Sequence, residues 1–204
     1  MTSRDYQTNA ENAICHEWET VPSTALVLPT GCGKTVCFAN VIKRRLPRRA
    51  LVIAHREELI YQARDKIQRF AEVECGIEMA ERYVNNSLFG ETPVVVSTIQ
   101  TLNSKWGDRH RMGRFKPTDF DTLIIDECHH ATADSYRRVI DYYRQNPNLK
   151  VLGVTATPDR ADEEALGQVF DTVAFDYEIL DAIRDGWLVP IEQQFVSIGG
   201  LDWS

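Results

Sequence analysis

Two groups of residues in this sequence have the types and spacing that phosphate chemistry requires. The first is a glycine-bearing turn followed by a cation and a hydroxyl, Gly31-Cys32-Gly33-Lys34-Thr35, and the second is an acidic pair, Asp126-Glu127. Glycines let several backbone N–H groups point into one concavity, and a following helix adds the positive end of its dipole. Lys34 could then reach the outer phosphates of a nucleotide, and the Thr35 hydroxyl could bind Mg²⁺.

The elements around these residues are those that would position them. The apolar run 25–28 predicts a buried strand that enters the turn at Pro29, and 36–45 has helical character. The apolar run 120–125 predicts a second strand, which leads directly into Asp126-Glu127. Two adjacent acids at the end of a buried strand are costly unless the chemistry requires them. In a phosphate-loop enzyme the first acid holds Mg²⁺, and the second orients or deprotonates the attacking water.

Alternatives remain open for both groups. The usual phosphate-loop pattern has a glycine where this chain has Leu28, so a glycine turn with a chance Lys-Thr is the competing interpretation. The triplet Cys128-His129-His130, beside the acidic pair, could indicate a zinc cluster. The chain lacks the four-ligand spacing of a zinc site, which disfavours that cluster.

The composition predicts one soluble globular domain. Of the 204 residues, 43% are hydrophobic and 26% charged, and neither a bilayer-length apolar run nor an apolar signal segment is present. Five scattered cysteines without a C-x-x-C pair favour a reducing compartment, so we expect a cytoplasmic protein with no membrane partner. The net charge of −7 excludes nucleic-acid binding through a generally basic surface, so such binding would use local patches.

Apolar runs alternate with amphipathic segments along the chain. Further buried strands are predicted at 49–55, 93–97, 150–154 and 172–178, with a short edge strand at 77–80. Further helices are predicted at 9–19, 56–70, 131–144 and 179–185. Near-continuous apolar strands that alternate with helices predict an α/β fold, in which a mainly parallel sheet carries helices on both faces in three layers.

Polar side chains follow several of the predicted strands, at the edge of a parallel sheet where ligands collect. His55 and Arg56 lie at one such junction. Ser97, Thr98 and Gln100 lie at another. Both groups could bind the backbone phosphates of a nucleic-acid strand, and the alternative for Ser97, Thr98 and Gln100 is that they cap the next helix.

Three further stretches have two interpretations each. Thr155 and Thr157 could couple a nucleotide site to a nucleic-acid site by hydrogen bonding, or could form a Thr-Pro turn with a helix cap. Gln7 could read the edge of an adenine with its amide, or could be a solvated residue at the start of a helix. The basic and aromatic segment 105–116 could bind single strands, or could be a long surface loop.

Taken together and in this order, the motifs resemble the N-terminal RecA-like ATPase domain of superfamily 2 helicases, of the DExH or type III restriction-subunit-like branch. The resemblance spans essentially the whole chain, and the family tolerates a residue other than glycine at Leu28. The Q motif corresponds to Arg4-Asp5-Tyr6-Gln7, motif I to Pro29-Thr30-Gly31-Cys32-Gly33-Lys34-Thr35, motif Ia to 54–59, a further strand-binding motif to 96–102, motif II to Asp126-Glu127-Cys128-His129 and motif III to 155–158.

The resemblance implies ATP and Mg²⁺ as cofactors. Lys34 and Thr35 would hold phosphates and Mg²⁺, Asp126 would bind the Mg²⁺, and Glu127 would position the hydrolytic water. The other nucleotide-binding residues would be Arg4, Gln7, Pro29, Thr30, Gly31, Cys32 and Gly33. The residues that link the ATP state to nucleic acid would be His129, Thr155 and Thr157.

The function that the resemblance implies is the motor domain of an ATP-dependent DNA helicase or translocase, at 1–190, with 191–204 as the start of a linker toward a second RecA-like domain. No second phosphate-loop-like half is present in the sequence. Loss of the arginine finger from such a domain typically costs ~10³–10⁵ in turnover, so we expect weak or absent activity from this chain alone.

DNA is favoured over RNA, because the motif set resembles the restriction and repair branch. Two other functions remain open. One is a non-catalytic, nucleotide-dependent nucleic-acid-binding module, and the other is the ATPase subunit of a restriction system.

Overall fold

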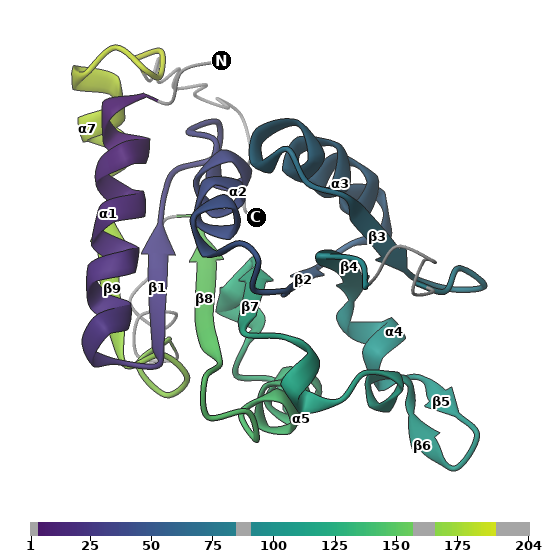
Figure 1. Ribbon diagram of the computed structural model, residues 1–204. Helices are drawn as coiled ribbons and strands as arrows, with labels where there is room; N and C mark the ends of the chain where they lie inside the picture. Colours follow the sequence, from purple (N-terminus) through teal and green to yellow (C-terminus); the bar gives the residue numbers. More distant parts are fainter. Residues whose placement is uncertain (1–3, 85–90, 157–165, 191–204) are drawn as a thin grey trace, which may run out of the picture.

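The computed structural model describes residues 4–84, 91–156 and 166–190. The main strands in this part of the chain are β1 (Ser23–Val27), β2 (Ala50–Ala54), β3 (Cys75–Glu78), β4 (Val94–Thr98), β7 (Thr122–Asp126), β8 (Lys150–Thr155) and β9 (Thr172–Asp176). They form one seven-stranded sheet in the order β3-β4-β2-β7-β8-β1-β9, with every neighbouring pair parallel (Figure 1). The carboxyl ends of all these strands therefore lie along one edge of the sheet, and the predicted parallel sheet is confirmed.

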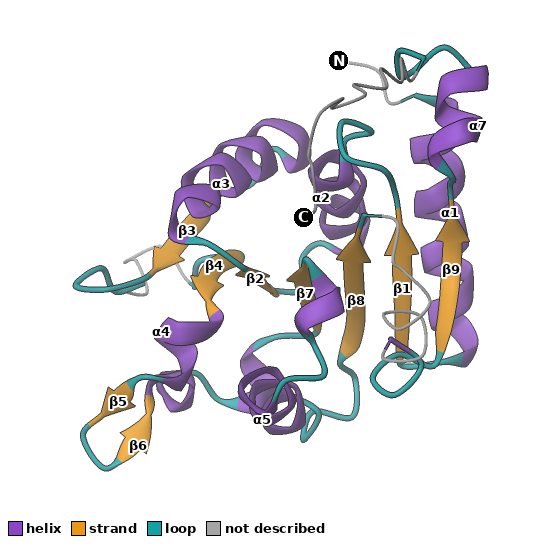
Figure 2. Cartoon of the chain, turned by 180° about the vertical axis from the view of Figure 1, so that it is seen from behind, coloured by secondary structure: helices purple, strands orange, loops and turns teal. Residues whose placement is uncertain are grey.

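Helices cover both faces of the sheet (Figure 2). On one face lie α1 (Asp5–Thr20), α2 (Lys34–Arg45) and α3 (Glu57–Ala71), and on the other lie α4 (Ile99–Asn103) and α5 (Asp134–Tyr143). The short helix α7 (Ile179–Arg184) follows β9 and packs its Ala182 into the core of the first face. The three predicted layers are confirmed. Within the described residues, no helix has the length and apolar character that a bilayer span requires.

The edge strand predicted at 77–80 lies at Cys75–Glu78, the helix predicted at 131–144 lies at Asp134–Tyr143, and two further elements differ more clearly from the sequence prediction. Helix α1 begins at Asp5, ahead of the predicted 9–19, and so includes Tyr6 and Gln7. The segment 105–116, for which a surface loop was one interpretation, contains a small antiparallel hairpin of β5 (Lys105–Trp106) and β6 (Arg109–His110). Each strand of this hairpin has two residues, which is too short for an apolar periodicity to show in the sequence.

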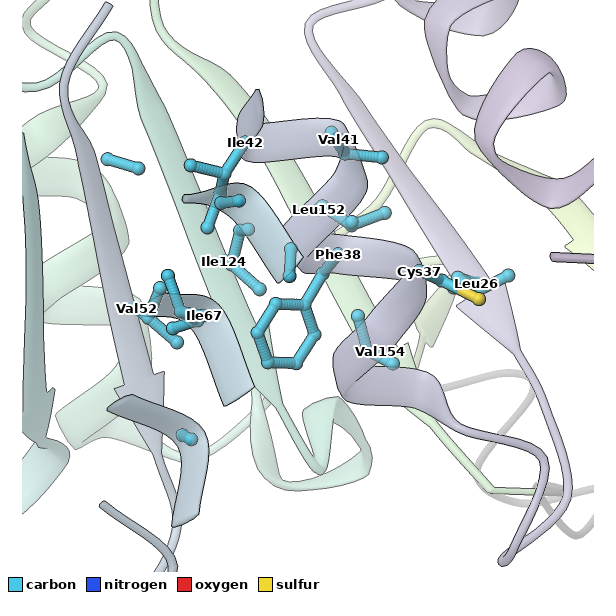
Figure 3. Packing of buried hydrophobic residues seen from close by; sticks show 14 of the residues in the cluster. Leu26, Cys37, Phe38, Val41, Ile42, Val52, Ile67, Ile124, Leu152 and Val154 are labelled. Atoms are coloured by element: carbon cyan, nitrogen blue, oxygen red, sulfur yellow. The ribbon is translucent and has the colours of Figure 1, made fainter. Parts of the chain in front are cut away.

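Alternate residues of each central strand enter different hydrophobic clusters, which is why these strands read as continuous apolar runs. In β2, Val52 belongs to the cluster under α1, α2 and α3, while Leu51 belongs to the cluster against α4 and α5. Figure 3 shows Phe38 of α2 among sheet residues of the first cluster, including Ile124 and Val154. Full burial of a side chain such as Phe38 stabilises the fold by roughly 1.5–3 kcal/mol. This packing fixes the start of α2 above the sheet edge.

All five cysteines are free thiols. Four of them are buried, namely Cys32 in the glycine loop, Cys37 in α2, Cys75 in β3 and Cys128 after β7. Cys15 on α1 is half-buried. Burial raises the pKa of each thiol above its ordinary value, so the protonated form is favoured at all five positions.

Candidate nucleotide-binding site

The glycine loop joins β1 to α2 and starts that helix without a capping side chain. Gly31 and Gly33 have φ values of +91° and +78°, a conformation that residues with side chains rarely adopt. Helix α2 begins at Lys34, directly after Gly33, and its first turn contains no acidic residue. Since the first N–H groups of a helix have no partner within it, they can donate to an anion. The loop and the helix start together form a site suited to a phosphate.

The acidic pair follows β7, and only β8 separates that strand from β1 in the sheet. Asp126 Oδ1 accepts a hydrogen bond of 3.1 Å from the backbone N–H of Glu127. Glu127 has a left-handed backbone conformation (φ +53°), which is uncommon outside glycine and often marks functional sites. Lys34 Nζ lies 3.7 Å from Glu127 Oε1, across the ends of β1 and β7. The structure thus brings together the three residues predicted to be catalytic.

The electrostatics of Asp126 bear on whether Mg²⁺ fits here. Burial, and after it the like charge of Glu127, raises the pKa of Asp126 to about 6, while Lys34 opposes the shift. A nearby dication would relieve this cost, and the Asp126 carboxylate and Thr35 hydroxyl are oxygen donors of the kind that Mg²⁺ prefers.

Within the described residues, no group of three or more His, Cys, Asp or Glu could hold a metal ion. Mg²⁺ commonly binds through one or two carboxylates, with water and substrate phosphates as its other ligands. The donors at this sheet edge therefore fit a Mg²⁺ ion that is bound jointly with a polyphosphate.

The start of α1 contacts the glycine loop directly. Gln7 is 5% exposed, and its Nε2 donates to the carbonyl oxygen of Cys32 over 3.2 Å. Tyr6 donates to the same carbonyl over 2.7 Å. The backbone N–H of Arg4 donates to Gln7 Oε1 over 3.0 Å, so both ends of the Gln7 amide are occupied. The interpretation of Gln7 as a solvated helix-start residue is therefore wrong, because its side chain is buried against the loop.

An aromatic cluster next to this contact was not found by sequence reasoning. Tyr6 stacks on Tyr177, with ring centroids 4.8 Å apart, and meets Trp187 edge to face at 5.8 Å. The Arg4 guanidinium lies 4.6 Å from the centroid of the Trp187 ring. Tyr177 also donates to Asp185 Oδ2 over 2.7 Å. The cluster joins the two ends of the described chain beside the loop, and no local pattern in the sequence pairs such distant segments.

Some of the residues predicted to contact nucleic acid lie together at the ends of β2 and β4. They line a hollow of about 460 Å³ whose walls are His55, Arg56, Glu57, Glu58 and Gln100. Arg56 and Gln100 are exposed, and His55 is half-buried. A basic and an amide side chain in one hollow can contact phosphate and sugar groups.

The other predicted contact residues behave differently. Ser97 and Thr98 are buried, with exposed fractions of 0% and 1%. Ser97 donates to the carbonyl oxygen of Glu78 over 2.8 Å, and the Thr98 hydroxyl accepts from the N–H of Thr101 at the start of α4. These hydroxyls thus make structural hydrogen bonds, including the helix cap that was the alternative interpretation. Thr157 lies outside the described residues.

His129 connects the acidic pair to the end of β8. Its Nδ1 lies 3.1 Å from Thr155 Oγ1 and 3.5 Å from Glu127 Oε2. The ring of His130 packs against both His129 and His55, with centroid distances of 4.1 Å and 4.2 Å. A chain of contacts therefore runs from Glu127 to the hollow that His55 lines. His130 was considered in the sequence only as part of a zinc cluster, so its position between the two sites is new.

Comparisons with known proteins identify a family and several relatives of this chain. The model of the family described as "Type III restriction enzyme, res subunit" matches residues 1–160. The protein IRC3 of Saccharomyces cerevisiae, named as a candidate ATP-dependent helicase, is 31% identical over 96% of this chain. This chain spans 29% of the length of IRC3.

Two solved structures have a similar fold. The type ISP restriction-modification enzyme LlaGI, solved with a DNA substrate mimic, matches 92% of this chain and 21% of its own, with a TM-score of 0.67 and 19% identity. The UvsW helicase of bacteriophage T4 matches 87% of this chain and 61% of its own, with a TM-score of 0.66 and 19% identity. The fold is therefore the RecA-like α/β fold that was predicted.

Proposed function

Because the chain belongs to the family of type III restriction enzyme res subunits, we propose that it is the ATP-binding motor domain of an ATP-dependent DNA helicase or translocase. In this proposal residues 1–190 are the first of two RecA-like domains, and 191–204 begin the linker to the second. The observation that carries the proposal is the 3.7 Å approach of Lys34 Nζ to Glu127 Oε1, beside the uncapped start of α2. This arrangement supports a site for a nucleoside triphosphate and an attacking water.

Each residue of the site has a defined task in this proposal. The loop N–H groups and Lys34 bind the phosphates, and Thr35 with Asp126 would hold Mg²⁺. When bound, Mg²⁺ neutralises charge on the phosphate oxygens. Glu127 orients the attacking water and accepts its proton. Gln7 would contact the adenine base, with an amide that its hydrogen bonds to Cys32 and Arg4 hold in position.

The proposal includes a second RecA-like domain, which forms the other wall of the nucleotide site. The side chains that support catalysis here all come from one sheet edge, so a facing surface is needed to enclose the phosphates. An arginine from such a surface typically contributes ~10³–10⁵ in turnover. We therefore propose that this chain alone binds nucleotide but hydrolyses it slowly.

For the nucleic acid, we propose DNA held at the hollow formed by His55, Arg56 and Gln100. This choice follows the restriction-enzyme family to which the chain belongs, and one structural neighbour of that kind, LlaGI, was solved with a DNA substrate mimic. Competition between DNA and RNA strands of the same sequence, in fluorescence anisotropy at fixed salt, tests this choice. Stronger binding of RNA would contradict it.

The nucleotide site is tested by calorimetric titration with Mg²⁺-ADP and Mg²⁺-ATP. Lys34→Ala is expected to weaken binding by about tenfold or more, because it removes a charge-assisted contact to phosphate. Lys43→Ala is the matched control, since Lys43 lies in the last turn of the same helix and pairs with Glu72 at the surface. Equal binding by wild type and Lys34→Ala would refute the proposed site.

The family description and the likeness to LlaGI favour a second candidate function, the ATPase subunit of a restriction system. This function would use the same nucleotide site, and a nuclease or methyltransferase partner encoded beside the motor would identify it. A non-catalytic binding module is separated from both by joining this chain to a second RecA-like domain. DNA-stimulated ATP hydrolysis that Glu127→Gln abolishes would show an enzyme, and no stimulation in the folded protein would favour the module.

A further inference from the structure

Two large aromatic side chains are exposed beside β3, which is one of the two outermost strands of the sheet; β9 is the other. Tyr83 and Trp106 are 42% and 44% exposed, and their rings meet edge to face with centroids 5.2 Å apart. Trp106 belongs to the β5–β6 hairpin, which extends from the body of the molecule next to α4 in Figure 1. Tyr83 follows β3 and comes from a different part of the chain. We call these two residues the aromatic pair.

Ion pairs with a buried carboxylate fix the position of the arginines that contact the aromatic pair. Glu78 is fully buried and binds both Arg111 and Arg114. The Arg111 guanidinium lies 4.4 Å from the ring centroid of Tyr83, and that of Arg114 lies 4.7 Å from Tyr83 and 4.9 Å from Trp106. An aromatic surface that is already fixed in position loses little entropy when a ligand stacks on it. The pair is therefore preorganised for binding.

The charge around the aromatic pair identifies the kind of ligand. Residues 105–116 include five Lys or Arg and one Asp, a formal charge of +4, in a chain whose net charge is −7. The guanidinium groups of Arg111 and Arg114, which contact the aromatic pair, share the single carboxylate of Glu78, so one positive charge is left without a partner carboxylate in this cluster. Lys105 and Arg109 are exposed on the hairpin beside Trp106. Exposed aromatic rings among cations suit the bases and phosphates of a single strand.

The hairpin is attached firmly to the helix that carries Gln100. His110 Nδ1 lies 2.8 Å from the carbonyl oxygen of Asn103, the last residue of α4, and the N–H of Arg111 donates to the carbonyl oxygen of Ser104 over 2.8 Å. Gln100, on the same helix, lines the hollow with His55 and Arg56. A strand bound at the hollow could therefore continue along α4 to the hairpin.

We infer that the aromatic pair is a stacking platform for the bases of a single-stranded nucleic acid, with Lys105 and Arg109 as its phosphate contacts. This inference rests on the proposed nucleic-acid binding and extends it to a surface outside the hollow. Base stacking on an aromatic side chain tolerates any sequence, because every base has a π-face. The platform would thus lengthen the bound strand without adding sequence preference.

The experiment compares two fluorescein-labelled strands with equal numbers of phosphates, an oligodeoxythymidylate and a strand of abasic sites. Anisotropy titrations measure both affinities for wild type, Trp106→Ala, Tyr83→Ala, Trp106→Phe and Arg109→Ala. We expect Trp106→Ala and Tyr83→Ala to weaken binding of the thymidylate by about tenfold, in line with stacking on aromatic residues, and to leave the abasic strand unchanged. Trp106→Phe should retain most of the affinity, and Arg109→Ala should weaken both strands and reduce the salt dependence.

Leu180→Ala is the matched control, because Leu180 is a large exposed apolar residue (65%) on α7, next to the opposite edge of the sheet. Circular dichroism and a Mg²⁺-ADP titration confirm that each variant is folded and binds nucleotide. Equal losses for the two strands, or none for either, would overturn the inference and indicate that the pair serves another partner, such as a protein. Failure of wild type to bind any strand would instead refute the proposed nucleic-acid site itself.

Discussion

The Nδ1 atom of His129 lies 3.1 Å from the hydroxyl oxygen of Thr155, which links the ends of the neighbouring strands β7 and β8. The same imidazole lies 3.5 Å from Glu127 Oε2 and packs against His130, which in turn packs against His55. Two predicted coupling residues are thus in contact at a point between the acidic pair and the proposed nucleic-acid hollow. We propose that a nucleotide which displaces Glu127 also displaces His129 and, through it, Thr155.

The first prediction concerns this contact. His129→Ala and Thr155→Val should each reduce the change in DNA affinity that a non-hydrolysable ATP analogue causes, a coupling that is typically about 1–3 kcal/mol. The double variant should lose little more than either single one, because both substitutions remove the same interaction. DNA affinities measured with and without the analogue give these values. His16→Ala, at an exposed histidine of α1 (79%), should keep the full coupling, and strictly additive losses in the double variant would argue against a shared contact.

The second prediction concerns the close approach of α1 to the glycine loop. A Cβ atom at Gly33 would lie 2.7 Å from Gln7 Nε2, whereas one at Gly186 would meet no atom within 4 Å, although both glycines have positive φ. Gly33→Ala should therefore cost about 1 kcal/mol more than Gly186→Ala, since it also disrupts the hydrogen bond of Gln7 to Cys32. Urea unfolding measures the difference. In a Gln7→Ala background the two substitutions should cost the same, and a persistent difference would mean that another contact is responsible.

The third prediction concerns the pH dependence of stability in metal-free buffer. The pKa of Asp126 is raised to about 6 from an ordinary value of 3.8, so the folded chain binds this proton more tightly than the unfolded chain. Stability contributed by this residue is then present below pH ~4 and is lost as the pH rises through ~6, at a cost of about 3 kcal/mol at most.

Asp126→Asn removes this cost while it keeps the shape of the side chain. Its free energy of unfolding should exceed that of wild type at pH ~7.5 and approach it near pH ~4, with the measurement made in the presence of a chelator. The same variant should lose ATP hydrolysis in a protein with both motor domains, because a proposed Mg²⁺ ligand is gone. A variant less stable than wild type at neutral pH would show that the carboxylate is favourably paired there.

The fourth prediction concerns the fully buried carboxylate of Glu78. Glu78→Gln leaves the guanidinium groups of Arg111 and Arg114 without a compensating charge, and breaking a buried ion pair in this way typically costs about 3–5 kcal/mol. Asp181→Asn breaks a solvent-accessible pair with Arg184, in which the arginine is exposed and the aspartate half-buried, and should cost less than about 1 kcal/mol. Thermal and urea unfolding compare the two. Similar small costs would show that water reaches the Glu78 site in the folded chain.

Much of the fold was predictable because buried parallel strands produce apolar runs. Such a run can be recognised in the sequence without knowing which strands lie beside it. The runs ending at Leu28 and Ile125 were found this way, and so were the residues that follow them, Lys34 and the acidic pair. The sheet edge that unites these residues follows from parallel strand direction alone. The relative order of the strands did not follow, since it depends on which apolar faces pack together.

The unpredicted parts depend on contacts between segments that are distant in the sequence. Gln7 is polar and near the chain start, and nothing in its neighbourhood reveals that Cys32 offers it a carbonyl. Tyr177 and Trp187 join Tyr6 only because β9 lies beside β1 and α1. Glu78 would be unfavourable on a buried strand, and it is accommodated because two arginines more than thirty residues later reach it.

Four buried thiols lie in four different parts of the fold, so their reaction with a thiol reagent can be used to measure local opening of the structure. A thiol reagent can modify Cys32, Cys37, Cys75 or Cys128 only when the surrounding structure opens, so each labelling rate measures the free energy of that opening. Cys15, which is half-buried, supplies the fast internal reference. Mass-resolved labelling with and without nucleotide would therefore map which elements the ligand tightens, with no substitution in the chain.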